Sequence, residues 1–430
     1  MNNFRRSEMN YKLLNSRLFY FAFSIIYFFI LCCSYIYLRE AYFTQSTFNF
    51  SIFKLLHVIT IFISFISFLP YKIKRISDLF ISIIFFNIIS PLLIVFAFDI
   101  RYDWEYIYSV LTTFLLIIFF RGYGSFSFLP VFKIDKRNII LILEILSIFG
   151  LIYLSIDIGF NSFNLNPKLV YNFRSTEFTL LGNYILSWLS RITIPIIACF
   201  SYQKKNYINL IICTLALIFI YGISSEKSIL LLPLFGILVS IYFDKFKNLS
   251  IIPIVISTVI LLSFFLFIIF GFNYLPSMVI RRSVFVPAEM ILHYLKFFDY
   301  NQFTYWSQNL IGNLFSTYPY EISPGELINK IIFAKDFGSS NVSFFGTAFM
   351  HAGIIGSIVY GIIMGFIFRF IDYFSSGNKN FLLITASAIV PLIVIITSSD
   401  LPTGILTHGL FLSLILIPFI QNKKIKINLK

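Results

Sequence analysis

Charged residues are scarce in this chain of 430 residues. Asp, Glu, Lys and Arg together account for 12% of it, whereas a typical soluble domain contains about 25%. Hydrophobic residues account for 58%, of which many are Phe and Tyr. This composition excludes an ordinary soluble globular protein and predicts an all-α membrane protein that crosses the bilayer several times.

Several familiar catalytic motifs are also absent. The chain contains no Walker loop, no Cys/His spacing typical of zinc sites and no G-x-S-x-G sequence, so ATP hydrolysis, a zinc site and an α/β-hydrolase mechanism have no support. We expect neither a metal nor a cofactor. All four cysteines fall inside apolar runs, which indicates small core residues rather than a disulfide framework: Cys32, Cys33, Cys199 and Cys213.

Long apolar runs, in contrast, are abundant, and twelve of them are long enough to cross a bilayer. The first follows a basic leader and lacks a small-residue cleavage site, so we interpret it as a retained span. The predicted spans are residues 18–38, 50–70, 79–98, 106–120, 139–156, 184–202, 207–223, 228–243, 249–271, 346–368, 381–398 and 404–420. We expect them to form one integral membrane domain over residues 1–430.

The distribution of Lys and Arg predicts the orientation of these spans. Basic residues concentrate in alternate short loops, at residues 71–75, 133–137, 204–205, 245–247 and 423–430. By the positive-inside rule these segments and both termini lie in the cytoplasm. The net charge of +14 is therefore explained by contact with membrane lipids, and its dispersal argues against a nucleic-acid partner.

Two segments predicted to be external are too long to be simple connections, residues 157–183 and 272–345. In the second, Pro287 predicts the start of an amphipathic helix on the outer interface. Its apolar face comprises Ala288, Ile291, Leu292, Leu295 and Phe298, and its polar stripe comprises Glu289, His293, Lys296 and Tyr300. Further on, Ser323 and Glu326 have the spacing of a capping box and predict a second short helix. Together these helices are expected to cover a cavity between the spans.

Small residues recur every four positions in the tenth span, at Gly353, Ser357, Gly361 and Gly365. Such a stripe lets the backbone of another helix approach closely. We interpret it as a packing surface without a chemical role.

Two adjacent arginines, Arg281 and Arg282, are the strongest candidates for ligand contact. Their guanidinium groups repel each other and are stabilised most by an anion with more than one charge, and the planar guanidinium donates parallel hydrogen bonds to phosphate oxygens. An interfacial anchor on lipid headgroups is the alternative interpretation.

Three other cations are candidates for the same anion. Arg191 lies deepest in an apolar run, and it either forms an ion pair with Glu144 or contacts the ligand. Arg174 stands three residues before Glu177, a spacing that permits a local salt bridge as well as a phosphate contact. Lys227 lies in a turn that is predicted to be external, where it either makes a second cationic contact with the ligand or is solvated.

The histidines supply candidates for a general base. His351 and His293 are placed toward the outer side and titrate near neutral pH, so either of them could accept a proton from a sugar hydroxyl. His57 is interpreted as a packed core residue.

The layout of the chain resembles the Wzy-type O-antigen or oligosaccharide repeat-unit polymerases. The resemblance extends over most of the chain and includes the sequences VYNFR at 170–174, SSEKS at 224–228, RRSVFVPA at 281–288 and FGTAFMHAGIIG at 345–356. It implies a glycosyltransferase of the multi-spanning GT-C type in a bacterial cytoplasmic membrane. Such an enzyme transfers a growing glycan from polyprenyl (undecaprenyl) diphosphate to a second lipid-linked repeat unit at the outer face, and a chain-length regulator is a potential partner.

Two alternatives remain open at this point. A flippase would move the same lipid-linked oligosaccharide across the bilayer, but flippases often contain internal repeats, which are not evident here. An O-antigen ligase would use the same donor and differ only in its acceptor. The large external segment near the C-terminal third favours an enzyme with an outer active site.

Overall fold

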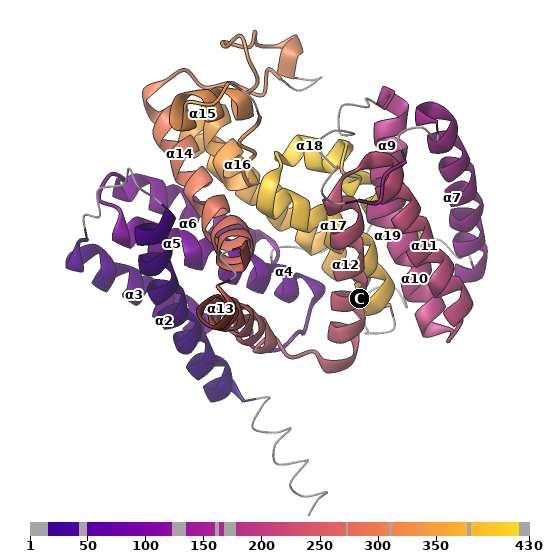
Figure 1. The fold of residues 1–430 in the computed structure, drawn as a ribbon, viewed down its shortest axis with the longest axis horizontal. Coiled ribbons are helices and arrows are strands. Elements are labelled where there is room, and N and C mark those ends of the chain that lie inside the picture. Colours follow the sequence, from indigo (N-terminus) through magenta and orange to yellow (C-terminus); the bar gives the residue numbers. More distant parts are fainter. Residues whose placement is uncertain are drawn as a thin grey trace, which may run out of the picture. The chain divides into compact units, whose positions relative to one another are not determined.

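The computed structural model describes residues 16–42, 50–122, 135–159, 163–166, 178–271, 274–308, 312–336, 338–375 and 380–420. Over these ranges the protein is helical, as predicted, and contains no β-strand (Figure 1). One isolated β-bridge joins Lys72 to Asn248.

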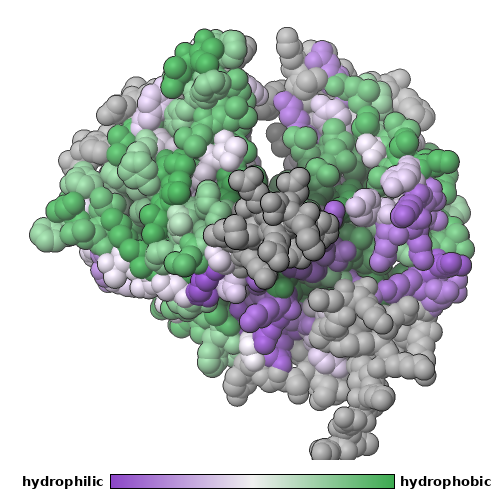
Figure 2. All heavy atoms as spheres, turned by 90° about the horizontal axis from the view of Figure 1, so that it is seen from below, coloured by the Kyte–Doolittle hydropathy of each residue, from purple (hydrophilic) through white to green (hydrophobic). Residues whose placement is uncertain are grey.

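Nine helices in the described ranges are long and apolar enough to cross a membrane. They are α2 (Arg17–Tyr42), α4–η1–α5 (Ile76–Phe98), α7 (Lys136–Ile158), α9–η3–α10 (Leu180–Gln203), α11 (Tyr207–Ser224), α12 (Lys227–Phe246), α13 (Ile251–Phe270), α16 (Phe344–Ser375) and α17 (Phe381–Ser398). Three shorter apolar helices coincide with the remaining predicted spans: α3 (Ile52–Phe68), α6 (Trp104–Phe120) and α19 (Leu410–Ile420). The multi-pass membrane class is therefore confirmed, and large apolar areas are visible on the surface in Figure 2.

The chain divides into two compact units. The first comprises residues 1–122, 247–366 and 396–401, and the second comprises residues 123–246, 367–395 and 402–430. The first unit thus contains α2 to α6 and α13, together with the predicted outer segment and most of α16. The second is built mainly from α7, α9 to α12, α17 and α19.

The predicted outer segment is largely helical. A π-helix, η4 (Pro276–Phe285), continues directly into α14 (Val286–Tyr300), so the helix begins before the predicted Pro287. The predicted apolar face is fully buried, since Ala288, Ile291, Leu292, Leu295 and Phe298 all have 0% exposure. The capping box of α15 (Pro324–Phe333) is confirmed, because the backbone N–H of Ser323 donates to Oε2 of Glu326 at 3.1 Å and the Ser323 hydroxyl caps the Glu326 N–H. Figure 1 draws these helices in orange.

The small-residue stripe packs α16 against α6. A Cβ atom at Gly361 would lie 2.8 Å from the carbonyl oxygen of Thr113, and the Ser357 hydroxyl lies 2.9 Å from that of Ser109. Gly365 likewise leaves no room for a side chain beside Phe120. The packing role is confirmed for three members of the stripe, while Gly353 has a different role.

In the first unit, loops that are predicted to lie on the same side of the membrane contact each other. Arg121 donates to Asp78 at 2.7 Å, and both residues lie in loops predicted to be cytoplasmic. The Tyr102 hydroxyl lies 3.3 Å from Nδ1 of His293, and both lie in segments predicted to be external. The alternation of sides is thus supported within this unit, while the side that faces the cytoplasm stays a prediction.

Candidate functional site

The helix α16 is broken immediately after His351. Ala352 (φ −157°, ψ 33°) and Gly353 (φ 58°, ψ −137°) have non-helical backbone angles, so the prediction of a continuous helix over 346–368 is wrong at this point. The break frees two carbonyl groups from the helical hydrogen-bond pattern. Those of Met350 and His351 accept instead from the backbone N–H groups of Thr304 and Tyr305, at 3.1 and 3.0 Å. A loop from the outer segment therefore takes the place of the next helical turn.

The His351 imidazole lies at this break with 1% exposure. Its Nδ1 atom accepts a hydrogen bond from the backbone N–H of Trp306 at 3.1 Å and lies 2.8 Å from the hydroxyl of Thr304. Because a backbone N–H can only donate, Nδ1 carries no proton in this arrangement. The proton of the neutral ring is then on Nε2, which donates to Oδ2 of Asp400 at 3.1 Å.

Asp400 is the acceptor at the centre of this network. It lies between α17 and α18 (Leu401–Leu406). In addition to the bond from His351, it accepts hydrogen bonds from the Tyr360 hydroxyl and from the backbone N–H of Leu401, both at 2.8 Å. Burial by itself would raise the pKa of Asp400, but the electrostatic interaction and hydrogen bond with His351 and the hydrogen bonds from the hydroxyls of Thr347 and Tyr360 lower it below its usual value. The Asp400 side chain keeps 15% exposure, compared with 1% for that of His351.

Trp306 forms an aromatic wall beside the pair. Its ring stacks on the His351 imidazole with centroids 5.0 Å apart and planes at 19°, and its Nε1–H donates to the Tyr360 hydroxyl at 3.0 Å. Tyr305 and Trp306 both have positive φ angles, 44° and 59°, which non-glycine residues rarely adopt. Strain of this kind concentrates at functional sites. We call Thr304, Trp306, His351, Tyr360 and Asp400 the helix-break cluster.

The second predicted base, His293, contacts different groups. It lies on α14, where burial, followed by the charge of Arg101, lowers its pKa to about 4. It therefore stays neutral at physiological pH, and its hydrogen-bond partner is the Tyr102 hydroxyl rather than a carboxylate.

Arg281 belongs to a group of ionised residues around α14. Asp99 accepts two short hydrogen bonds from Arg101, at 2.6 and 2.9 Å, and lies 3.5 Å from the guanidinium of Arg39. Glu289, with 9% exposure, interacts electrostatically with Arg281, Arg39, Asp99 and Arg101. Burial raises the pKa of Glu289 to about 7, although the arginines oppose this. We call Arg39, Asp99, Arg101, Arg281 and Glu289 the α14 ionic cluster.

The other predicted cations are dispersed. Arg282 is exposed, with its Nη1 atom 3.6 Å from Sδ of Met278, and is adjacent in sequence to the α14 ionic cluster. Lys227 is exposed at the start of α12 in the second unit. Arg174 lies outside the described residues, as does Glu177.

The proposed ion pair between Arg191 and Glu144 is wrong. In the second unit Arg191 hydrogen-bonds Nδ1 of His408, whereas Glu144 accepts from Nδ2 of Asn209 at 2.9 Å. The interpretation of Arg191 as an internally paired residue remains, with a neutral imidazole as the partner in place of a carboxylate.

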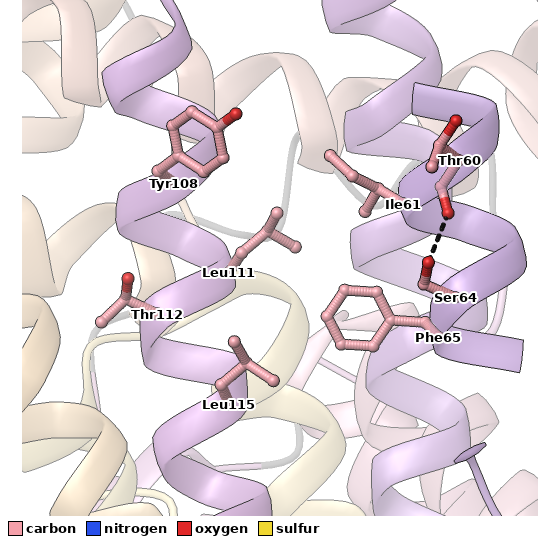
Figure 3. Close-up of a pocket in the computed structure, with 8 residues that line it drawn as sticks. All are labelled: Thr60, Ile61, Ser64, Phe65, Tyr108, Leu111, Thr112 and Leu115. Atoms are coloured by element: carbon pink, nitrogen blue, oxygen red, sulfur yellow. Dashed lines mark hydrogen bonds between the residues drawn. The ribbon is translucent and has the colours of Figure 1, made fainter. Parts of the chain in front are cut away.

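A groove on the surface of the first unit lies between α3 and α6 and has a volume of about 260 Å³ (Figure 3). Its polar atoms include the hydroxyls of Thr60, Ser64 and Tyr108, but Ser64 is already hydrogen-bonded to the Thr60 carbonyl at 2.8 Å. His57 is exposed and lies 2.9 Å from the Tyr108 hydroxyl, so its interpretation as a packed core residue is wrong. The groove contains no ionisable group other than this tyrosine, which makes it a poor reaction site.

The helix-break cluster is thus the better candidate. Sequence reasoning found His351 but missed Asp400 and Tyr360. The available signal was that Asp400 is the one acidic residue between the last two predicted spans. The chain matches no known protein-family model, no curated protein and no solved structure.

Proposed function

We propose that the protein is an integral membrane glycosyltransferase that polymerises polyprenyl-diphosphate-linked oligosaccharide repeat units, as its resemblance to the Wzy-type polymerases implies. The observation that carries the proposal is the helix-break cluster. A buried His351 donates a hydrogen bond to the carboxylate of Asp400, whose side chain is partly exposed, beside an aromatic wall and in a unit that also contains a group of arginines.

The reaction requires three operations. A hydroxyl of the acceptor sugar forms a bond to the anomeric carbon of the donor, the bond from that carbon to the diphosphate oxygen breaks with its electron pair passing to the diphosphate, and the hydroxyl proton passes to a base. In our proposal Asp400 receives this proton. His351 positions the carboxylate of Asp400 through the Nε2–H hydrogen bond, because the imidazole itself is too buried to contact the acceptor sugar.

The developing negative charge on the leaving diphosphate would be stabilised by Arg281 and Arg282. Arginines that contact this group stabilise the transition state more than the ground state, because charge accumulates there during transfer. The ring of Trp306, whose face stacks on His351, would help to orient a sugar. Both groups belong to segments predicted to lie on the outer side, where the lipid-linked units are joined.

Surface glycolipid from cells that produce variants of the protein tests the proposal. We expect Asp400→Asn and the double variant Arg281→Ala/Arg282→Ala to reduce the polymer ladder to core with a single repeat unit, while the protein reaches the membrane in normal amount. Asp299→Asn is the matched control, since Asp299 is an exposed acid on α14, and it should retain the ladder. Full polymer in the Asp400 variant would refute its role as base.

The broken helix also favours a second candidate, a flippase. Discontinuous membrane helices and buried ionisable residues occur at the substrate sites of transporters. The same gel separates the two functions. A flippase variant would deliver no repeat unit to the surface, whereas a polymerase variant still delivers single units. A ligase variant would also leave the core bare, but would let polymer accumulate on the polyprenyl carrier.

A further inference from the structure

The predicted outer segment contains a stretch without charged residues. Residues 300–320 include no Asp, Glu, Lys, Arg or His, although Asp299 and Glu321 flank them directly. Aromatic rings, amides and hydroxyls take the place of charges. Depletion of charge together with enrichment in Tyr and Trp is typical of the centre of a binding surface. We call residues 300–320 the uncharged stretch.

Large parts of the uncharged stretch are exposed. Tyr300, Tyr305 and Phe315 have exposures of 74%, 48% and 85%. The amide side chains of Asn301 and Gln302 are exposed as well. Flat rings close to amides in sequence suit a sugar, because the C–H face of a pyranose packs on an aromatic ring while its hydroxyls exchange hydrogen bonds with amide groups. Since the stretch contains no cation that could compensate an acidic group, it suits an uncharged ligand.

Tyr305 stands out in this stretch because its backbone is strained. Its φ of 44° lies in the left-handed region, which glycine adopts without strain. Its N–H donates to the His351 carbonyl at 3.0 Å, and any residue other than proline can supply this bond. The ring meets that of Phe303 edge to face, with centroids 6.1 Å apart, and about half of the side chain stays exposed. Neither the backbone nor the packing requires a tyrosine at this position, whereas contact with a ligand would.

Two contacts fix the shape of the uncharged stretch. The Tyr320 hydroxyl donates to the Gln302 carbonyl at 2.6 Å, which ties the end of the stretch to its beginning. The short helix η5 (Gly312–Leu314) lies directly against Trp306, since a Cβ atom at Gly312 would collide with the Trp306 carbonyl oxygen. A surface fixed in this way loses less conformational entropy when a ligand binds. Because Trp306 also belongs to the helix-break cluster, the surface adjoins the candidate site.

We propose that the uncharged stretch binds neutral sugar residues of a glycan. The ring of Tyr305 stacks on one pyranose, and the exposed amides bind sugar hydroxyls, while the sugar nearest to Asp400 lies at Trp306. This inference rests on the proposed function, because the glycan is taken to be the one that is joined at the helix-break cluster. It adds the class of substrate, namely repeat units whose sugars carry no charge where they contact this surface.

The test measures binding of an oligosaccharide to the purified full-length protein in lauryldimethylamine oxide, a detergent without a sugar headgroup. The probe is the repeat unit released by mild acid from the surface glycan of cells that produce the protein. Saturation-transfer NMR identifies the sugar C–H groups that contact the protein, and titration gives the affinity. We expect transfer to the C–H groups of neutral sugars in the unchanged protein.

Tyr305→Gly should lower the affinity at least fivefold without lowering the melting temperature, because glycine adopts this φ without strain. Tyr305→Phe keeps the ring and should retain most of the affinity. Tyr274→Gly is the matched control, since Tyr274 is a tyrosine of the same unit with 65% exposure outside the stretch, and its affinity should be unchanged.

Three results would overturn the inference. They are equal affinity of Tyr305→Gly and the unchanged protein, contact through acidic sugars, and absence of binding. In the last case, quenching of a Phe315→Trp variant by brominated phospholipids in nanodiscs would assign the stretch to the bilayer surface. The proposed function is judged separately, because full polymer from Asp400→Asn refutes it whatever the binding result.

Discussion

Replacement of Gly353 by alanine should close the break in α16. The backbone angles at Gly353, φ 58° and ψ −137°, lie in a region that is nearly restricted to glycine, and a non-glycine residue held there is strained by about 1 to 3 kcal/mol. An added Cβ would also lie 3.0 Å from Cζ of Phe303, which is a tight contact. With a central value of about 2 kcal/mol, the broken conformation becomes about 30-fold less favourable relative to a regular helix.

A straightened helix would take back the carbonyls of Met350 and His351 that now accept from Thr304 and Tyr305. The loop would then lose its anchor, and the ring of Trp306 would move away from His351. We expect Gly353→Ala to lower the melting temperature and to expose the imidazole. Modification of His351 by diethyl pyrocarbonate, quantified by mass spectrometry, reports this exposure directly, because the side chain is now 1% exposed.

Gly271→Ala is the matched control. Gly271 also has a positive φ angle, 67°, in the first unit, but a Cβ there meets no atom within 4 Å. The control should lower stability by about 1 kcal/mol and leave His351 protected. Equal protection of His351 in both variants would refute the argument that a glycine maintains the break.

Three further predictions concern individual side chains. Burial raises the pKa of Glu289 in the folded state from 4.5 to about 7, so ionisation of this group opposes folding. The melting temperature should therefore fall as pH rises from 5 to 8, and the loss in free energy of unfolding should approach about 3 kcal/mol. Differential scanning fluorimetry should show that Glu289→Gln is insensitive to this change of pH. Gly361→Val should destabilise the protein by more than about 2 kcal/mol, because the valine side chain would collide with the backbone of α6 at Thr113. Gly271→Val is the control, since it would strain only its own backbone. Equal melting temperatures for the two variants would contradict the packing argument. If the proposed transferase function holds, His351→Gln should reduce turnover and leave the KM for the acceptor nearly unchanged, because in that proposal His351 acts through Asp400. Steady-state kinetics that show only a raised KM would argue for direct contact with the acceptor.

The fold was predictable from the sequence to the extent that it depends on hydrophobic patterning. Each predicted apolar run coincides with a helix, and the capping box at Ser323 was found because its signal is local. The break after His351 was not found. Glycines at four-residue spacing fit helix packing and a helix break equally well, and the choice depends on whether a distant loop offers N–H groups to the freed carbonyls.

Side-chain partners were the least predictable part of the site. His351 was singled out by its residue type and its place in the tenth run, but its acceptor, Asp400, is 49 residues away in sequence. Arg281 could be singled out from the sequence because Arg282 is adjacent to it. Arg39 and Arg101, in contrast, come near Arg281 only through tertiary packing. The pairing of Arg191 with His408 shows the same limitation, because a buried guanidinium requires an acceptor and the sequence does not reveal which one.

The dependence of the helix-break cluster on Asp400 has a consequence for biosynthesis. The segment 300–306 and the first half of α16 leave the ribosome well before residue 400, so His351 must enter the membrane without its acceptor. Until α17 is inserted and the following turn folds back onto the first unit, the imidazole has an unpaired Nε2–H. The helix-break cluster is therefore incomplete in the nascent chain, and it forms only when the segment that contains Asp400 has been synthesised and has folded.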